Sequence, residues 1–482
     1  MKLGQWPRRV DKSRAKYFRL FPCIPFGAAE IRGMIKRIVI LGAGRSSSSL
    51  IRHLLQNAES EGFTVRIGDL DPDLAARKAE GHPDASTFAL DANNPEARRQ
   101  EIDQADLVIS MLPAFLHPEV ARDAIATRTP LITPSYLSPE IAAMDAEAKA
   151  AGIPILNELG LDPGIDHLSA MEVIDGLRAE GCTLTGFESY TGGLVAPDSD
   201  DNPWHYKFTW NPRNVVLAGQ GGSATFKENG RIRVLPPHRL FQEITAVDVP
   251  GAGRFEGYAN RDSLAYEEIY GIQGIDTLVR GTLRGDGFCG GWDAVFQLGM
   301  NRDDAQVAYP EGTTWREFTA GFSGGVPQGA DAGAVRDAVA KSTGADDRAL
   351  DLLDNLGLFG DAPLPRGSGS PADILQALLE ERWALQPGDL DMIVMWHRFH
   401  YRDAEGRDRV RTSHLVHIGE DETHTAMSLT VGLPLALAAR MWVRSDWSGT
   451  GVLLPTTPDL YAPLLKGLAA EGISFTETEL PL

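Results

Sequence analysis

The chain has 482 residues, of which 43% are hydrophobic and 23% are charged. This composition is ordinary for a globular protein and excludes a disordered chain, a collagen and a disulfide scaffold. Lysines and arginines number 46 against 66 aspartates and glutamates, which gives a net charge of −20. Because nucleic-acid affinity comes mainly from cationic side chains, we expect no nucleic-acid partner.

The cellular compartment is indicated by the cysteines and the apolar runs. Three cysteines are too few for a disulfide framework and indicate a reducing environment. The most apolar stretch, about 429–439, is too short to span a bilayer and contains Pro434. These features predict a cytoplasmic protein with no membrane partner.

The first 33 residues form a basic head without the long apolar core of a signal peptide. They are poor in acids, like a transit peptide, but serine is scarce. Met34 stands directly before the first expected strand, and we favour it as the natural start. We therefore expect 1–33 to be a disordered extension.

From Lys36 onward, short β-branched runs alternate with helical stretches, which is the pattern of a parallel sheet with crossover helices. A helix is expected to end near residue 61 and another to cover 139–151. The expected strands of this sheet are 37–41, 64–68, 86–90, 107–111, 131–133 and 153–157.

After Gly164 the composition changes, because glycines and aromatic residues increase and regular intervening helices disappear. This pattern predicts a mixed or antiparallel α+β region over about 165–300. Residues 313–385 are expected to be mostly helical, with a break at 361–371. A β-hairpin at 391–400 and 410–417 follows, and the tail is expected to contain a helix, a strand, a second helix and a second strand.

A glycine-rich turn directly follows the first expected strand and opens a helix. Its sequence is Gly42-Ala43-Gly44-Arg45-Ser46-Ser47. Gly42 permits the tight turn, and Gly44 lets the backbone approach a pyrophosphate. Ser46 and Ser47 lie at the positive end of a helix, which suits phosphate, and Ser47 replaces the third glycine of the fingerprint. The turn therefore predicts a dinucleotide site in a Rossmann unit.

The preferred dinucleotide depends on Asp69, which ends the second expected strand. An acid at this position binds the ribose hydroxyls and repels a 2′-phosphate, so it favours NAD over NADP. Arg45 in the glycine-rich turn is the residue that would reverse this preference by reaching the phosphate. Asp91 and Leu112 follow the third and fourth strands, at the adenine and nicotinamide edges of such folds.

Residues 157–167 read NELGLDPGIDH, a run with three acids, a histidine and two glycines that packing does not explain. With these residues the chain resembles the saccharopine dehydrogenase family, in particular its L-glutamate-forming branch. Further motifs carry the resemblance in order along the chain: Ser135-Tyr136, Gly192-Gly193-Leu194, Asn202-Pro203-Trp204, Tyr206-Lys207-Phe208, Asn260-Arg261-Asp262-Ser263 and Arg280-Gly281-Thr282-Leu283-Arg284.

The resemblance implies an α/β fold in which a Rossmann-type parallel sheet is completed by C-terminal residues. A mixed α+β substrate and dimerisation domain with a helical subdomain would be inserted into it, and the protein would be a homodimer. The expected division is an extension over 1–33, a dinucleotide-binding domain over 34–164, the inserted domain over 165–425 with its helical part at about 313–385, and a return to the first domain over 426–482.

The resemblance also implies which residues touch the ligands. Asp162 and Tyr136 would act at the reacting centre. Further cofactor contacts would come from Leu70, Pro134, Ser135, Leu161, Pro163 and Asn211. The substrate would be held by Ser135, Tyr136, Asp162, Arg213, Arg261, Thr282, Leu283 and Arg284.

Saccharopine carries three carboxylates, so a site for it needs several fixed cations, and arginine binds carboxylates in bidentate fashion. Arg213 and Arg280 fit equally well as ion-pair residues, whereas Arg261 and Arg284 are favoured as substrate ligands. Oxidation at a C–N bond needs a base for the amine proton. Asp162 is the best-placed carboxylate, and Tyr136 is able to donate or accept at the same centre.

Some nearby residues have two interpretations. Asp166 and His167 either support the site or form a helix N-terminus. His397 and His400 are three apart in a strand and therefore face opposite ways, so we expect no metal site. Two positions differ from the fungal family pattern. Asp69 stands where those enzymes carry an arginine for the NADP phosphate, and Thr191 replaces a cysteine.

The expected activity is an NAD(P)-dependent saccharopine dehydrogenase in lysine metabolism. One alternative is a carboxyspermidine-type dehydrogenase that acts on a more cationic secondary amine. Another is a nucleotide-sensing Rossmann protein without turnover. The retained Asp162, Tyr136 and arginines favour the enzyme with the tricarboxylate substrate.

Overall fold

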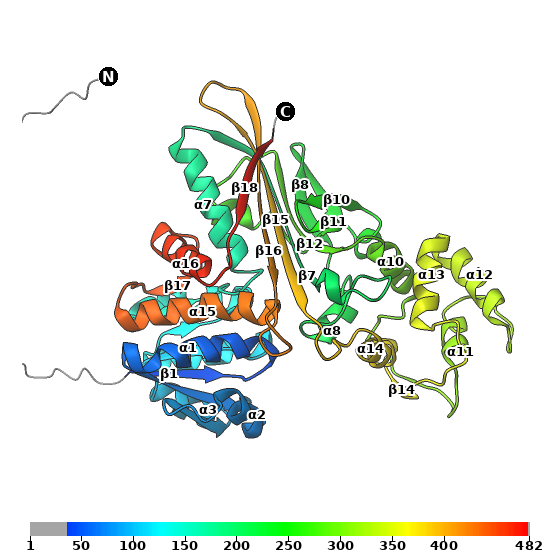
Figure 1. The fold of residues 1–482 in the computed structure, drawn as a ribbon, viewed down its shortest axis with the longest axis horizontal. Coiled ribbons are helices and arrows are strands. Elements are labelled where there is room, and N and C mark those ends of the chain that lie inside the picture. Colours follow the sequence, from blue (N-terminus) through cyan, green and yellow to red (C-terminus); the bar gives the residue numbers. More distant parts are fainter. Residues whose placement is uncertain (1–35, 481–482) are drawn as a thin grey trace, which may run out of the picture. The chain divides into compact units, whose positions relative to one another are not determined.

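The computed structural model describes residues 36–480, so the expected extension over 1–33 lies outside the described residues. Seven parallel strands form the first sheet in the order β17-β6-β5-β4-β1-β2-β3. Figure 1 labels β1 and β17 of this sheet. The strand order reverses between β1 and β4, and in such sheets ligands bind at the carboxyl edge beside this point. The strands are β1 (Lys36–Leu41), β2 (Phe63–Asp69), β3 (Ala85–Ala89), β4 (Leu107–Ser110), β5 (Leu131–Ile132), β6 (Pro154–Leu156) and β17 (Gly451–Leu453).

Helices cover both faces of this sheet, which is why its central strands are apolar throughout. Residues 38–41 and 107–109 are completely buried. The expected helix over 139–151 is split into two, because the backbone at Met144 has a ψ of 1° and leaves the helical path. The helices are α1 (Ser48–Glu61), α2 (Pro72–Ala79), α3 (Pro95–Asp103), α4 (His117–Thr127), α5 (Pro139–Ala142), α6 (Asp145–Ala151), α15 (Ala426–Arg444) and α16 (Pro458–Ala470).

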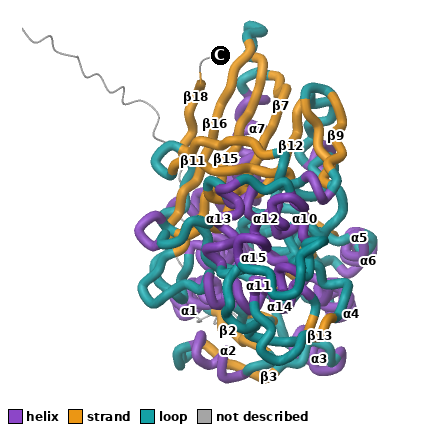
Figure 2. The backbone as a smooth tube through the Cα atoms, turned by 90° about the vertical axis from the view of Figure 1, so that its right-hand side faces the viewer, coloured by secondary structure: helices purple, strands orange, loops and turns teal. Residues whose placement is uncertain are grey.

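The second sheet has nine strands, with the main order β10-β11-β12-β7-β15-β16-β18 and the β8–β9 hairpin attached to β12. Only β12 and β7 pair in parallel, so the sheet is mixed, as predicted. Its long strands β7, β15 and β16 run together in Figure 2. The strands are β7 (Thr183–Val195), β8 (Ala224–Glu228), β9 (Arg231–Leu235), β10 (Ile244–Val249), β11 (Gly253–Ala259), β12 (Thr277–Gly285), β15 (Asp391–Arg402), β16 (Asp408–Ile418) and β18 (Thr476–Leu480).

A helical region lies between β12 and β15 in the sequence and forms its own aromatic core. Trp204, Trp292 and Trp383 are fully buried there and pack against one another or against Phe288. The expected break at 361–371 contains β14 (Ser368–Gly369), which pairs with β13 (Val307–Ala308). The remaining helices are α7 (Ile165–Ala179), α8 (Pro212–Val216), α9 (Tyr266–Ile269), α10 (Phe288–Leu298), α11 (Trp315–Ala320), α12 (Ala332–Thr343), α13 (Asp347–Leu356) and α14 (Pro371–Arg382).

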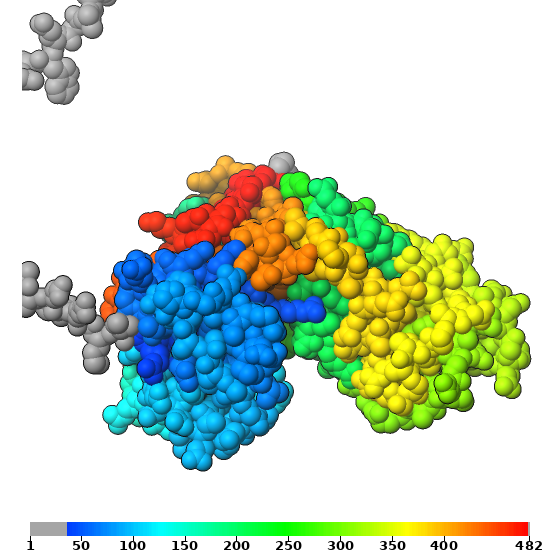
Figure 3. Space-filling model, turned by 60° about the horizontal axis from the view of Figure 1, so that its bottom comes forward, coloured from blue at the N-terminus to red at the C-terminus, as the bar shows by residue number. Residues whose placement is uncertain are grey.

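The C-terminal segment returns to the first sheet, but its last strand does not. Helix α15 packs on α1, and β17 pairs with β6. Figure 3 shows the orange and red surface of the C-terminal segment next to the blue surface of the N-terminal part of the described chain. Gly432 permits the close approach of the two helices, because a Cβ there would lie 2.7 Å from the Leu50 nitrogen. In contrast to the expected return of all residues over 426–482, β18 extends the second sheet beside β16. It covers the unpaired edge of that sheet, and Glu479 accepts a 2.8 Å hydrogen bond from the Tyr401 hydroxyl.

Helix α15 is the one described helix that is long and apolar enough to cross a membrane by length and composition alone. Of its most apolar window, 72% is buried inside the protein. The apolar surface of α15 is therefore used in the core, where it packs against α1, α16 and β15.

Candidate active site

The glycine-rich turn lies at the carboxyl edge of the first sheet, between β1 and α1. Gly42 has a φ of +102°, and a Cβ there would lie 3.0 Å from the Met111 carbonyl oxygen. Gly44 precedes a 3-10 turn over 45–47, and nothing lies within 4 Å of the point where its Cβ would be. The first N–H groups of such a turn have no acceptor within the helix, so they are available for phosphate.

A cleft of about 780 Å³ opens beside this turn. Its walls include Ala43, Arg45 and Ser48 on one side, and Phe208 and Pro212 on the other. Ser47 is buried, and its hydroxyl donates to the Gly44 carbonyl at 2.8 Å, which fixes the turn. The size of the cleft and the exposed backbone of the turn fit a dinucleotide.

Asp69 lies at the carboxyl end of β2, next to the glycine-rich turn. Its carboxylate accepts hydrogen bonds from the backbone N–H of Ala43 at 2.6 Å and of Asp71 at 3.0 Å. The Lys78 ammonium donates to the Gly44 carbonyl. Burial lowers the pKa of Lys78 to about 8, and the nearby Asp69 carboxylate opposes this shift. Sequence analysis did not identify Lys78, because its place beside the turn depends on the fold of α2.

The other predicted cofactor residues lie at or near the carboxyl edge of the sheet. Leu70 is 77% exposed just after β2, and Asp91 follows β3 and accepts from the Asn93 N–H at 2.9 Å. Leu112 follows β4 and is half-buried. Asn211 caps α8 directly before Pro212, which lines the cleft. Pro134, Ser135, Leu161 and Pro163 lie in the loops after β5 and β6.

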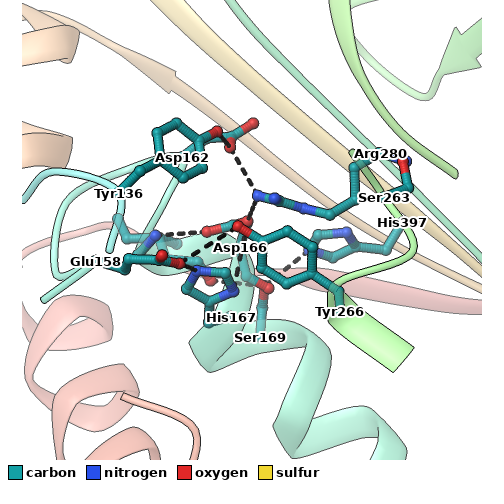
Figure 4. A network of polar contacts seen from close by, with 12 residues as sticks. Tyr136, Glu158, Asp162, Asp166, His167, Ser169, Ser263, Tyr266, Arg280 and His397 are labelled. Carbon is teal, nitrogen blue, oxygen red and sulfur yellow. Dashed lines mark hydrogen bonds and ion pairs between the residues drawn. The ribbon is translucent and has the colours of Figure 1, made fainter. Parts of the chain in front are cut away.

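Two of these loops and the second sheet bring three side chains together (Figure 4). The Tyr136 hydroxyl, from the loop after β5, donates to Asp162 Oδ1 at 3.0 Å. Arg280 on β12 donates to the same oxygen at 2.9 Å and also pairs with Asp166 on α7. Asp166 in turn accepts from the Gly164 N–H at 2.5 Å, so it supports the site from the first turn of α7, whereas the N-cap position of this helix is Gly164.

The charges of this cluster follow from its burial. Burial and the neighbouring Asp166 raise the pKa of Asp162, while Arg280 and the Tyr136 hydroxyl oppose the rise. Burial and Asp162 raise the pKa of Tyr136 well above its ordinary value, so this hydroxyl stays protonated and acts as a hydrogen-bond donor. Burial acts to lower the pKa of Arg280, but Asp166 and Asp162 raise it overall, so the guanidinium keeps its charge.

A second buried carboxylate lies beside the first. Glu158 accepts from the Leu137 N–H at 2.8 Å through Oε1, and its Oε2 lies 2.8 Å from His167 Nε2. His167 Nδ1 lies 2.7 Å from the Tyr270 hydroxyl. Glu158 has a φ of +55°, a conformation that is uncommon for a residue with a side chain and is often retained at functional sites.

Both carboxylates line a cavity of about 260 Å³. Tyr136, Tyr266 and Arg280 also line it, and Arg261 lies at its rim. The exposed Arg261 guanidinium lies 4.7 Å from the centre of the Tyr136 ring. Sequence analysis did not assign roles to Glu158 or Tyr266, although the density of acids in NELGLDPGIDH is the signal that would have identified Glu158.

Arg284 lies four residues after Arg280 on the same strand and is 4% exposed. Tyr206, Tyr258 and Phe288 surround its guanidinium, with ring centres at 5.2, 6.0 and 5.4 Å. Within residues 36–480 it forms no salt bridge, and its Nε has no hydrogen-bond partner. A buried unpaired cation is costly, so this arrangement favours an anionic ligand.

Two predicted substrate residues are placed elsewhere by the structure. Arg213 bonds Asp373 at 2.9 Å and Asp303 at 3.2 Å, which favours its interpretation as an ion-pair residue. Leu283 is fully buried in an apolar cluster with Tyr190, on the face of β12 opposite to Arg284. Alternation along the strand explains this, because Thr282 and Arg284 share one face and Leu283 takes the other.

Histidines near the site have structural partners. His397 is buried 2.8 Å from the Ser169 hydroxyl, whereas His400 lies 3.2 Å from Glu188 on the opposite face of β15. Among the described residues, no group of three metal-binding side chains gathers. His117, which sequence analysis did not identify, lies with Nε2 2.8 Å from the Ser135 hydroxyl. Burial lowers the pKa of His117 to about 4, so it holds Ser135 as a neutral imidazole.

Two family models account for most of the chain. Residues 38–156 match the saccharopine dehydrogenase NADP binding domain, and residues 160–473 match the saccharopine dehydrogenase C-terminal domain. The chain belongs to the saccharopine dehydrogenase family. The predicted resemblance, the α/β fold class and the dinucleotide-binding domain are thereby confirmed.

Individual members of the family cover the chain almost completely. The saccharopine dehydrogenase [NADP(+), L-glutamate-forming] of Saccharomyces cerevisiae is 35% identical over 90% of this chain and 97% of its own length. The mitochondrial alpha-aminoadipic semialdehyde synthase of Bos taurus is 35% identical over 92% of this chain. The chain spans about half of that protein, 48% of its length.

Solved structures agree with this assignment. The apo saccharopine dehydrogenase (L-Glu forming) from Saccharomyces cerevisiae superimposes with a TM-score of 0.84 and 33% identity, over 92% of this chain and all of that one. A homospermidine synthase from Legionella pneumophila in complex with NAD gives a TM-score of 0.54 at 10% identity, over 92% and 91% of the two chains. The second likeness shows a shared fold alone.

Proposed function

We propose that this protein is an NAD(P)-dependent oxidoreductase that acts on the C–N bond of saccharopine in lysine metabolism. Saccharopine, NAD(P)⁺ and water would give glutamate, 2-aminoadipate 6-semialdehyde, NAD(P)H and a proton. The observation that carries the proposal is the half-buried Asp162 carboxylate, bonded to Tyr136 and Arg280 at the edge of the dinucleotide-binding sheet. A nucleotide sensor would have no use for this cluster.

The cofactor would be held by the turn at Gly42 and Gly44, with Asp69 toward the adenosine ribose. The open backbone at Gly44 and the cleft beside Arg45 fit the dinucleotide. When bound there, NAD(P)⁺ would supply the hydride acceptor for the oxidation of the substrate carbon. The chain's own residues bind and orient the substrate and accept its proton.

Substrate binding is supported by the spacing of cations on one face of β12. Arg280 and Arg284 are four residues apart, which corresponds to about 13 Å along a strand. Arg280 is already neutralised by Asp162 and Asp166, so it positions those carboxylates rather than binding substrate. Arg284 and Arg261 remain for the substrate carboxylates. This spread of cations suits an extended molecule with carboxylates at both ends.

Proton transfer is assigned to Asp162. A secondary amine must lose its proton before its carbon gives up a hydride, and Asp162 is the pocket carboxylate with a raised pKa. Tyr136 stays protonated and donates to Asp162, which orients the carboxylate. Arg280 fixes the same oxygen from the other side. In the reverse direction Asp162 returns the proton to the amine.

We also infer a preference for NAD, based on the carboxylate of Asp69. The preference contrasts with the NADP(+) in the names of the fungal relatives. For the assembly we infer a cytoplasmic homodimer. Ile232 and Val234 on β9 and Ile244 on β10 are 65%, 62% and 45% exposed, and an apolar surface of this kind is typical of a contact between copies. Light scattering on the purified protein measures the assembly.

The deciding experiment follows reduced cofactor at 340 nm with purified protein and saccharopine. Absorbance that rises with NAD⁺ or NADP⁺, together with glutamate as a product, supports the proposal. Turnover of carboxyspermidine alone would assign the protein to the alternative dehydrogenase. Cofactor binding without turnover of either amine would indicate a nucleotide sensor.

A further inference from the structure

The buried cluster beside the cavity has more negative than positive groups. Glu158 is 3% exposed, Asp162 is half-buried and Asp166 is 1% exposed. The Arg280 guanidinium pairs with Asp162 and Asp166 but not with Glu158. His167, the remaining basic side chain of this cluster, lies between Glu158 and Tyr270. Buried charge is stable only when it is paired, so an excess of carboxylates favours a cationic ligand in the cavity.

Glu158 is held in place by the groups around it. Its two oxygens face the Leu137 N–H, the His167 ring and, at 3.4 Å, the Tyr266 hydroxyl. Glu158 also lines the cavity, so its negative charge is presented to a bound molecule.

The other carboxylates near the cavity have different tasks. Asp162 is bonded to Tyr136 and Arg280 and is assigned to the reacting nitrogen. Asp166 already forms an ion pair with Arg280 and accepts a hydrogen bond from the Gly164 N–H. Asp262 is exposed and accepts from the Thr225 hydroxyl and the Leu264 N–H. Glu158 lines the cavity and has no contact to Arg280, so it is the carboxylate that we assign to an ammonium group.

Arg261 supplies the opposite charge at the same cavity. Its exposed guanidinium lies over Tyr136, at the rim, whereas Glu158 lies in the wall. A carboxylate and a guanidinium at one small cavity match the two charges of an α-amino acid. The volume of about 260 Å³ is sufficient for the head of an amino acid.

We propose that Glu158 binds the α-ammonium group of the aminoadipate part of the substrate, while Arg261 binds the α-carboxylate beside it. The proposal rests on saccharopine being the substrate and adds a direction to its binding. The amino-acid head of the aminoadipate part lies in the cavity at Glu158, and the glutamate part extends along β12 toward Arg284. Glu158 thereby selects substrates whose far end carries a primary ammonium.

The test combines two substrates with three proteins. The substrates are saccharopine and its analogue without the α-amino group, in which a hydrogen replaces the ammonium. The proteins are wild type, Glu158→Gln and Glu188→Gln. Glu188 is a matched control, because it is also a glutamate beside a histidine, but it is half-buried and lies on the opposite face of the second sheet. The measurements are kcat/KM and, independently of turnover, the Kd from calorimetry.

We expect wild type and Glu188→Gln to prefer saccharopine by about 10- to 100-fold, as for a charge-assisted hydrogen bond, and Glu158→Gln to lose most of this preference. The analogue should bind Glu158→Gln about as well as wild type. An equal loss for both substrates in Glu158→Gln would show a structural role and overturn the proposal. If the variant does not fold, wild type alone tests the proposal, because an equal kcat/KM of wild type for saccharopine and its analogue would also overturn it. Absence of saccharopine binding to wild type would instead refute the proposed function itself.

Discussion

Cofactor preference is the prediction in which local charge and the names of the relatives disagree. The Asp69 carboxylate is fixed by the backbone N–H groups of Ala43 and Asp71, at 2.6 and 3.0 Å. At a separation of about 4 Å and an effective dielectric constant of about 20, two unit charges repel by about 4 kcal/mol. Lys78 and Arg45 lie in the same cleft and offset part of this repulsion. A tenfold preference requires only about 1.4 kcal/mol, so we expect NAD to be favoured by at least about tenfold.

The assay compares kcat/KM for NAD⁺ and NADP⁺ and the Kd of NADH and NADPH from fluorescence without substrate. Asp69→Arg should reverse the preference, because it exchanges repulsion for a bidentate contact with the phosphate. Lys78→Met should strengthen the preference for NAD, because it removes a compensating charge. A wild-type protein that binds NADPH ten times more tightly than NADH would refute the idea that Asp69 sets the cofactor preference. If Lys78→Met then lost this preference for NADPH, the 2′-phosphate contact would be assigned to Lys78.

Three other expectations concern the reacting centre, the substrate cations and the buried histidines. Asp162→Asn should lower kcat by about 100-fold or more, with little change in cofactor Kd. The variant should also lose the decline of the rate that wild type shows below the raised pKa of Asp162. A variant that keeps the wild-type kcat at every pH would exclude proton transfer by this residue. Arg261→Ala and Arg284→Ala should each raise KM for saccharopine by about tenfold or more at unchanged cofactor affinity, and a normal KM in both would place the substrate elsewhere. Burial lowers the pKa of His117 and His397 from 6.5 to about 4. For each histidine, the free energy of unfolding should therefore fall by about 3 kcal/mol as the pH falls from about 6.5 to about 4. Urea unfolding of wild type and His117→Gln at pH 7 and pH 4.5 measures this, and equal pH dependence of the two proteins would contradict it.

The strand pattern of the first domain was predictable because its sequence is local and periodic. Six strands alternate with helices, and Gly42 and Asp69 follow β1 and β2 as the dinucleotide fingerprint requires. The strand β18 was not predictable in this way. Its pairing with β16 depends on which sheet edge lies nearby, and the local sequence of residues 476–480 does not carry that information.

The chemistry of the site could be predicted only in part from the sequence, because it depends on contacts between residues that are remote in the sequence. The motif at 157–167 indicated Asp162, but the partners of that carboxylate are remote in the sequence. Arg280 reaches it because β12 pairs with β7 in parallel register, which places residue 280 opposite Ser189 beneath α7. Arg213 illustrates the opposite error, since an arginine in a suitable motif is used instead by Asp373 of the helical region.

Helix α15, from late in the sequence, contacts the start of helix α1 beside the glycine-rich turn. Ser49, two residues after the glycine-rich turn, donates its N–H to the Ser428 hydroxyl at 3.0 Å, although 379 residues separate the two. During synthesis the glycine-rich turn is therefore made long before helix α15, which carries Ser428. The long chain segment between the two must be closed into a loop, at an entropic cost, before the contact forms. A chain that stops short of residue 426 lacks α15 and β17, and therefore also lacks the Ser428 contact that holds the start of α1.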